Sequence, residues 1–123
     1  MILEEYLEMK QALQDSIEHH ESMSEWVETQ DLSAHPDIVE MFTKIREWWK
    51  GNNCALCQKY CQILNPCKKC PLYLTGQGCN RIGSYWNRLN NSTTWKEWLK
   101  WDRKLIKHMR KIMKGIKLDK GTI

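Results

Sequence analysis

The residues of this chain best suited to chemistry are its six cysteines, which all lie between positions 54 and 79. Two Cys-x-x-Cys pairs, separated by nine residues, dominate the arrangement. Each such pair forms a tight turn that presents two thiolates to one ion, and two turns complete a tetrahedron. The spacing therefore predicts a metal site whose first-choice ligands are Cys54, Cys57, Cys67 and Cys70.

The two remaining cysteines leave the ligand set open. Cys79 competes for one of the four places, because Gly76 and Gly78 allow the backbone to turn sharply and bring it back. Cys61 is the weakest candidate. The expected cofactor is one zinc ion per chain. An iron–sulfur cluster is the alternative, because the cysteines are closely spaced and Cys70 precedes a proline, although the ferredoxin spacing is absent.

Disulfides are the competing use of these cysteines. Six cysteines in a secreted chain would suggest three bridges, but the N-terminal residues are acidic where a secretory signal carries lysine or arginine. The clustering in Cys-x-x-Cys pairs also favours reduced thiols. We therefore expect a cytoplasmic protein, and no apolar run is long enough for a membrane span.

The elements that position the cysteines are predicted to be helices. From Ile2 to about Thr29 apolar residues recur three and four apart, which predicts one long helix or two shorter ones. The polar stretch 18–22 interrupts this pattern, and His19 and His20 within it are expected to face solvent. A second helix is predicted from the Pro36-Asp37 pair to about residue 50, with a stop at 51–53.

A third helix is predicted from a capping box, in which Thr94 and Glu97 satisfy each other's orphan backbone donors. An apolar seam follows as far as Ile116. The expected fold is all-α, with three or four amphipathic helices and a short cysteine-rich module between the second and third. At 123 residues, the chain is one domain, with an acidic arm at 1–50, the metal module at 51–89 and a basic helix at 90–123.

Charge is divided sharply along the chain, although the formal net charge is only +4. Residues 1–49 carry twelve acidic and three basic side chains, whereas residues 50–123 carry sixteen basic and three acidic ones. Such asymmetry is typical of proteins that bind nucleic acid, a membrane surface or an acidic protein. The competing interpretation is that the acidic arm folds against the basic helix. The candidate binding residues on this helix are Lys100, Trp101, Arg103, Lys104, Lys107, Arg110 and Lys111.

The cysteine motifs also resemble a known family. The order Cys-x-x-Cys, Cys-x-x-Cys-Pro and Thr75-Gly-Gln-Gly-Cys79, followed by a tyrosine, resembles small, mostly uncharacterised bacteriophage proteins predicted to bind zinc. The resemblance covers about residues 54–85. That family typically has Thr-Pro-Tyr after the last cysteine, where this chain has Ile82-Gly83-Ser84-Tyr85. The resemblance implies a phage or mobile-element accessory protein in the cytoplasm of a bacterial host, and it supplies no biochemical activity.

The sequence argues against an enzyme. An all-cysteine zinc site is usually closed, no histidine lies beside a nucleophile motif, and neither a Walker loop nor a dinucleotide fingerprint is present. Seven tryptophans favour a protein that binds a host or defence protein, with Trp49 and Trp101 as exposed anchors. The alternatives are a nucleic-acid binder using the basic helix and, less favoured, an iron–sulfur redox sensor. The long seams fit a homodimer as well as a monomer.

Overall fold

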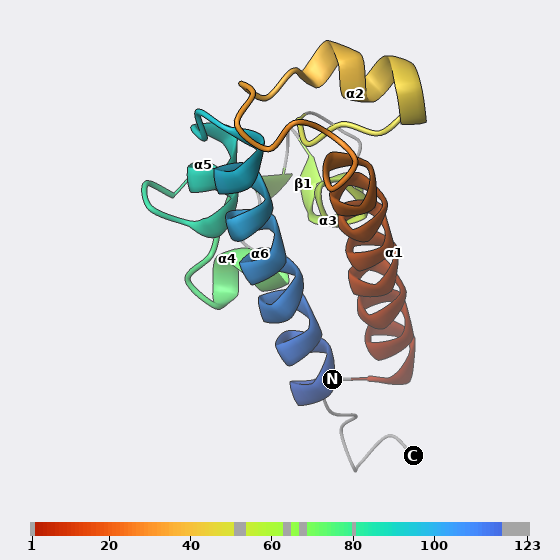
Figure 1. Ribbon diagram of the computed structural model, residues 1–123. Helices are drawn as coiled ribbons and strands as arrows, with labels where there is room; N and C mark the ends of the chain where they lie inside the picture. Colours follow the sequence, from red (N-terminus) through yellow and green to blue (C-terminus); the bar gives the residue numbers. More distant parts are fainter. Residues whose placement is uncertain (1, 51–53, 63–64, 67–68, 80, 117–123) are drawn as a thin grey trace.

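Two long antiparallel helices form the frame of the molecule (Figure 1). Helix α1 spans Leu3–Val27 and helix α6 spans Trp95–Gly115. The computed structural model describes residues 2–50, 54–62, 65–66, 69–79 and 81–116. The two helices pack along most of their length, with the first turn of α1 and the last turn of α6 at the same end (Figure 1).

Shorter elements cover the frame at one end and along one side. Helix α2 (Ile38–Ile45) crosses the far end, while α3 (Ala55–Tyr60), α4 (Pro71–Leu74) and α5 (Tyr85–Asn90) belong to the segment between the long helices. Strands β1 (Cys61–Gln62) and β2 (Asn65–Pro66) form a two-residue antiparallel ladder. The all-α prediction is confirmed, but the described part of the chain forms six helices rather than three or four.

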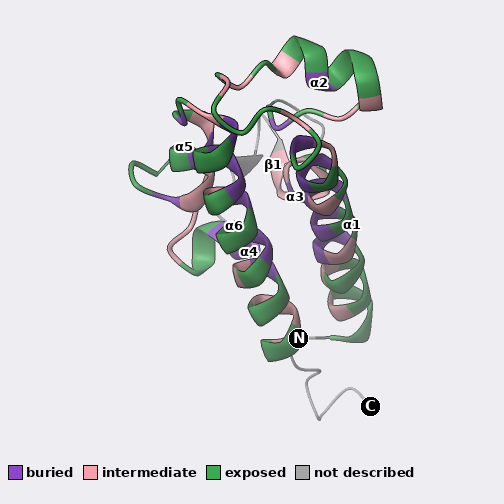
Figure 2. Ribbon diagram, viewed as in Figure 1, coloured by how far each residue is buried: buried purple, intermediate pink, exposed green. Residues whose placement is uncertain are grey.

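The apolar core has two parts, one at each half of the frame. One part joins α1 and the C-terminal half of α6 to the cysteine segment, through Leu13, Ile17, Leu56, Leu72 and Leu105. The other joins the end of α1 to α2, α5 and the start of α6. Figure 2 shows the buried residues on the facing sides of α1 and α6, with exposed residues on their outer faces. Among the described residues, no helix is long and apolar enough to cross a membrane.

Helix α1 runs without interruption through its polar stretch, so the first alternative, one long helix, is confirmed, whereas the prediction that His19 and His20 face solvent is wrong. His19 and His20 are buried, with exposed fractions of 9% and 3%. Each imidazole is held by a carboxylate from elsewhere in the chain, Glu47 for His19 and Asp102 for His20. Polar residues can occupy a buried helix face when their hydrogen bonds are satisfied in this way.

Helix α2 ends five residues earlier than predicted. Arg46 adopts a left-handed backbone conformation with φ of 58° and donates its N–H to the Phe42 carbonyl at 2.8 Å. The helix ends there, so the predicted apolar stripe does not extend to the two following tryptophans, and these differ in burial. Trp49 is only 7% exposed and donates its indole N–H to Asn90 Oδ1 at 3.2 Å, whereas Trp48 is 37% exposed. Trp49 is therefore a core residue, and the prediction that it is an exposed anchor is wrong.

The cap of α6 forms as predicted on one side only. Thr94 Oγ1 accepts a hydrogen bond from the Glu97 N–H at 3.2 Å. The Glu97 carboxylate instead accepts from the N–H and hydroxyl of Thr93, at 2.9 and 3.0 Å, rather than from the Thr94 N–H. The Glu97 carboxylate thus accepts from a residue four positions earlier, whereas the standard capping box joins residues three positions apart.

We expect Thr94→Ala to lower the free energy of unfolding by about 1 kcal/mol, because an orphan N–H in the first turn of α6 loses its acceptor. Urea unfolding followed by circular dichroism measures this change. Lys96→Ala is the matched control, since Lys96 is exposed two residues further along and its side chain makes no capping contact. Equal stability of Thr94→Ala and the wild type would contradict the assignment of the cap.

Candidate metal centre

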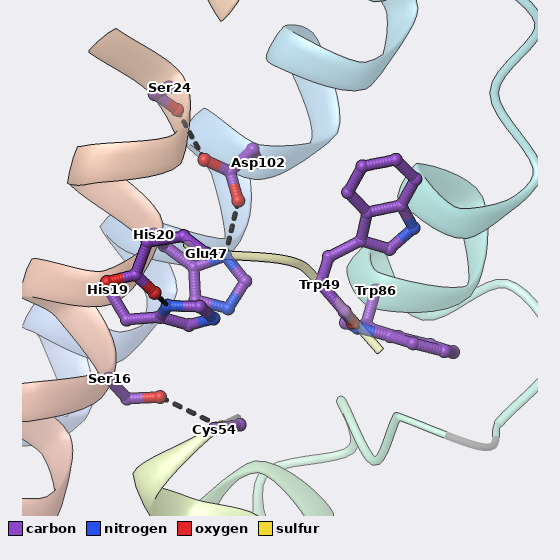
Figure 3. Close-up of polar contacts among 9 residues, drawn as sticks. All are labelled: Ser16, His19, His20, Ser24, Glu47, Trp49, Cys54, Trp86 and Asp102. Carbon is purple, nitrogen blue, oxygen red and sulfur yellow. Dashed lines mark hydrogen bonds and ion pairs between the residues drawn. The ribbon is translucent and has the colours of Figure 1, made fainter. Parts of the chain in front are cut away.

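A cavity of about 290 Å³ lies where the cysteine segment meets the two long helices. Its wall contains the thiols of Cys54, Cys57, Cys70 and Cys79, together with two imidazoles from the middle of α1. Apolar side chains, among them Leu56, Leu72 and Leu105, complete the lining. Figure 3 shows His19, His20 and Cys54 on one side of this region and Trp49 and Trp86 on the other.

Three separate segments bring the four thiols to the cavity. Cys54 caps the start of α3 and Cys57 lies in the first turn of that helix. Cys70 occupies the equivalent capping position of α4, and Cys79 follows the loop after it. That loop turns back at Gly76, whose φ is +81°, and is closed by a hydrogen bond of 2.8 Å from the Gln77 N–H to the Leu72 carbonyl. The expected role of the glycine turn in returning Cys79 agrees with this geometry.

The other two cysteines, Cys61 and Cys67, are not among these four thiols. Cys67, one of the first-choice ligands, lies outside the described residues. Cys61 is disulfide-bonded, whereas we expected all the thiols to be reduced. It lies in β1, directly opposite Pro66 of β2. The free thiols in the described part of the chain are thus those of Cys54, Cys57, Cys70 and Cys79.

Three of these thiols, those of Cys54, Cys57 and Cys70, have a raised pKa. Hydrogen bonding with Cys57, followed by burial, raises the pKa of Cys54 well above the ordinary thiol range. The hydrogen bond with Cys54 lowers the pKa of Cys57, but that with Cys79, burial and the nearby thiols outweigh it and raise the pKa to about 11. Burial also raises the pKa of Cys70, against hydrogen bonds from the backbone at Leu72 and Tyr73. A cation among the thiols would reverse this balance, because it favours thiolates.

The candidate ligands, the four thiols and two imidazoles, line one cavity but are not arranged around a common point. Within the described ranges, no three or more His, Cys, Asp or Glu side chains stand in an arrangement ready to hold an ion. The chemistry of the donor set nevertheless fits zinc, since thiolates and imidazoles are its commonest protein ligands. Metal binding at this cavity would therefore draw together side chains that already share one wall.

The second feature of the site is a buried polar chain between α1 and α6. His20 Nδ1 donates to Asp102 Oδ1 at 2.5 Å, and the Ser24 hydroxyl donates to the other carboxylate oxygen (Figure 3). Asp102 is completely buried, and Ser24 is 6% exposed. Burial lowers the pKa of His20, but the charge of Asp102 and its hydrogen bond raise it by more. This pair of residues was missed in the sequence, although both lie in phase with the apolar seams of their helices.

The neighbouring histidine behaves differently. His19 hydrogen-bonds to Glu47 and to the backbone at Trp48. Burial, reinforced by repulsion from His20, lowers its pKa despite the nearby carboxylate. Below the two imidazoles, the Ser16 hydroxyl lies 3.1 Å from Cys54 Sγ, so α1 also contacts the first predicted ligand (Figure 3).

The predicted binding residues on α6 separate into two groups. Arg103 and Arg110 pair with Glu28 and Glu21 of α1, each at 2.9 Å, so the acidic arm does fold against part of the basic helix. The structure gives no ion pair with a described residue for the four lysines, which are Lys100, Lys104, Lys107 and Lys111. All four are exposed.

Trp101 is half-buried rather than a free anchor. Its ring stacks on Tyr85 at a centroid distance of 6.3 Å. Three cations surround it, with Arg88 and Lys100 at 4.8 Å from the ring centroid and Lys104 at 5.0 Å. The indole therefore gathers positive charge on the surface between α5 and α6.

We expect His108 to titrate below the ordinary histidine pKa of about 6.5, because burial and then the charge of Lys111 lower its pKa. Below that pH the unfolded chain then binds more protons than the folded one, so this residue's contribution to stability falls as the pH drops. An NMR titration of the imidazole C–H signals measures the midpoint. Lys111→Gln should move it upward, whereas Lys114→Gln, which removes the same charge one turn further on, should move it less. A midpoint at or above 6.5 would contradict the assignment.

Comparison with known proteins assigns no family to this arrangement. No family model, curated protein or solved structure matches the chain. The resemblance to phage zinc proteins thus stays a prediction from the cysteine motifs, and the case for a function rests on the cavity and the surfaces described above.

Proposed function

We propose that the protein is a zinc-stapled, non-enzymatic interaction protein. The observation that carries this proposal is that free thiols from three separate segments line one cavity against the α1–α6 frame. A tetrahedral ion bound by four protein ligands has no open position for a substrate, so its role is structural. The ion would fix the short helices α3 and α4, which contain only six and four residues.

Elemental analysis with an absorption spectrum, on protein purified without oxygen, tests the metal. One zinc per chain and no visible absorption would support the proposal, and the double variant Cys54→Ser/Cys57→Ser should lose the ion. Leu74→Ala is the matched control, because Leu74 belongs to the same segment, is 66% exposed and does not line the cavity. Iron with sulfide and a brown colour would favour the cluster alternative, and metal-free protein would overturn both.

The partner we propose is a protein of the bacterial host or its defence system, met in the host cytoplasm. Besides the family resemblance, the support is an apolar group on and beside α2. Val39 is 70% exposed, and Phe42 and Trp48, each 37% exposed, contact each other with ring centroids 5.0 Å apart. Exposed aromatic residues of this kind anchor protein interfaces.

Crosslinking in infected or expressing cells, followed by mass spectrometry, tests this surface. We expect one stoichiometric partner that is lost with Val39→Ser/Phe42→Ser. Leu74→Ser/Ile82→Ser is the control, because both residues are exposed apolar residues elsewhere on the chain. Capture that is insensitive to the α2 substitutions would contradict the assigned interface.

The second candidate is nucleic-acid binding by the outer face of α6. The observation favouring it is that Lys100, Lys104, Lys107 and Lys111 are exposed and have no carboxylate partner among the described residues, with Arg88 and Trp101 beside them. Phosphate contacts release counterions, so the affinity for labelled duplex DNA or RNA should fall steeply with salt, with a log–log slope of about −0.9 per contact for DNA. Changing the four lysines to glutamine should remove the slope, and no binding at low salt would exclude this function.

A further inference from the structure

His20 occupies a position that an aliphatic residue would normally fill. It lies in the middle of α1, is 3% exposed, and is in phase with the buried residues Leu13, Ile17 and Val27. Burying an imidazole, a carboxylate and a hydroxyl together costs several kcal/mol of desolvation, which apolar side chains of similar size would avoid. The side chains of His20, Asp102 and Ser24 are therefore costly to bury if they serve packing alone. This cost indicates that His20 has a function at the cavity that it lines.

The hydrogen bonds of His20 leave one ring nitrogen available. Nδ1–H donates to Asp102, so in the neutral ring, the form that binds a metal, the lone pair lies on Nε2. Metal-binding histidines almost always donate their other N–H to a carboxylate or carbonyl, which orients the ring and raises its basicity. The Asp102 carboxylate, which orients the His20 ring, in turn accepts a hydrogen bond from the Ser24 hydroxyl.

The cavity brings this imidazole to the thiols. His20 shares the cavity wall with all four free cysteines, and the Ser16 contact holds Cys54 against the same helix, one turn earlier. His19 is less suited to this role, because it already hydrogen-bonds to the Trp48 backbone as well as to Glu47. Of the two imidazoles, His20 is thus the one whose free nitrogen has no other described partner.

Charge favours a mixed ligand set. Four thiolates around a divalent ion leave a net charge of −2, whereas three thiolates and a neutral imidazole leave −1. The wall of the cavity contains Leu56, Leu72, Leu105 and Trp86, so the smaller charge is less costly to bury. We infer that His20 Nε2 is a ligand of the metal ion bound at this cavity, alongside three of the thiols of Cys54, Cys57, Cys70 and Cys79. This inference rests on the proposed metal-binding function.

The direct test is to load ¹⁵N-labelled protein with ¹¹³Cd and record long-range ¹H–¹⁵N spectra of the histidine rings. We expect a ¹¹³Cd–¹⁵N coupling at His20 Nε2 and none at His19. One cadmium per chain without this coupling would overturn the inference and leave the proposed function intact. Failure to bind cadmium or zinc at all would overturn both, and this measurement needs no substitution.

Variants give an independent readout through affinity, measured by competition with a zinc indicator. We expect His20→Gln to weaken zinc binding by at least about 100-fold, and Asp102→Asn by about 10- to 100-fold as a positioning residue. His19→Gln is the matched control and should change the affinity by less than about threefold, because His19 and its partners, Glu47 and the Trp48 backbone, lie outside the proposed ligand set. The Co²⁺ spectrum of His20→Gln should also differ from that of the wild type. Equal affinity and spectra for the two histidine variants would contradict the inference.

Discussion

Removing the proposed metal ion, or replacing Cys54 or Cys70 by alanine, is expected to unfold residues 54–79 while α1 and α6 stay paired. Helices of four and six residues are far below the length of about 12–15 residues at which isolated helices become marginally stable in water. Leu56 and Leu72 are buried against the frame, and we expect the order of both helices to depend on this packing and on the proposed ion. Since metal-binding energy is folding energy in such small modules, we expect a loss of at least about 3 kcal/mol.

Hydrogen exchange measured by mass spectrometry separates the two regions. Chelator is added without reductant, so that the disulfide of Cys61 stays intact. Amide protection should fall by at least about 100-fold in residues 54–79, corresponding to about 3 kcal/mol, and change little in α1 and α6. Leu74→Ala, an exposed change in the same segment and outside the cavity lining, should leave the protection unchanged. Protection that survives both chelation and the cysteine substitutions would show that packing alone holds this segment.

The second large effect is expected from Asp102→Ala, which should cost about 3–5 kcal/mol of unfolding free energy. The substitution leaves His20 and Ser24 buried without their common acceptor, between α1 and α6. Asp102→Asn should cost less, because its amide oxygen still accepts one of the two hydrogen bonds. Urea unfolding of the three proteins at neutral pH gives the comparison.

The neighbouring ion pair supplies the control for Asp102. Arg103 pairs with Glu28 on the surface, and both side chains are more than half exposed. Solvent screens such pairs, so Arg103→Gln should change the stability little. If Asp102→Ala were as mild as Arg103→Gln, the buried network would not hold the helices together, and the orienting role assigned to Asp102 would fail with it.

The long helices could be predicted from the sequence because their apolar periodicity is local information. The start of α6 at Thr94 and the course of α1 agree with the pattern. The short helices α3, α4 and α5 could not be predicted in this way, since they contain fewer than two turns and depend on packing against the frame. The end of α2 was missed because Arg46 adopts a left-handed conformation that is uncommon in residues other than glycine.

The candidate site was predictable only for its cysteines. The Cys-x-x-Cys spacing pointed to the thiols, but nothing local links His20 to Asp102, which lies 82 residues away. A signal was nevertheless present in the two seams. A histidine in phase with Leu13 and Ile17, and an aspartate in phase with Trp98 and Leu105, are polar residues on faces that are otherwise apolar. Opposed polar residues of this kind on two long helices are a reason to predict that they meet.

The buried His20–Asp102 contact also bears on how the two long helices align. Apolar seams such as those of α1 and α6 tolerate sliding by one turn, because leucine, isoleucine and methionine side chains can exchange neighbours at small cost. A slip at this contact would instead bury an imidazole and a carboxylate apart from each other. We therefore expect the pair to fix the register and antiparallel orientation of the helices, and to disfavour misaligned pairing both within the chain and between chains.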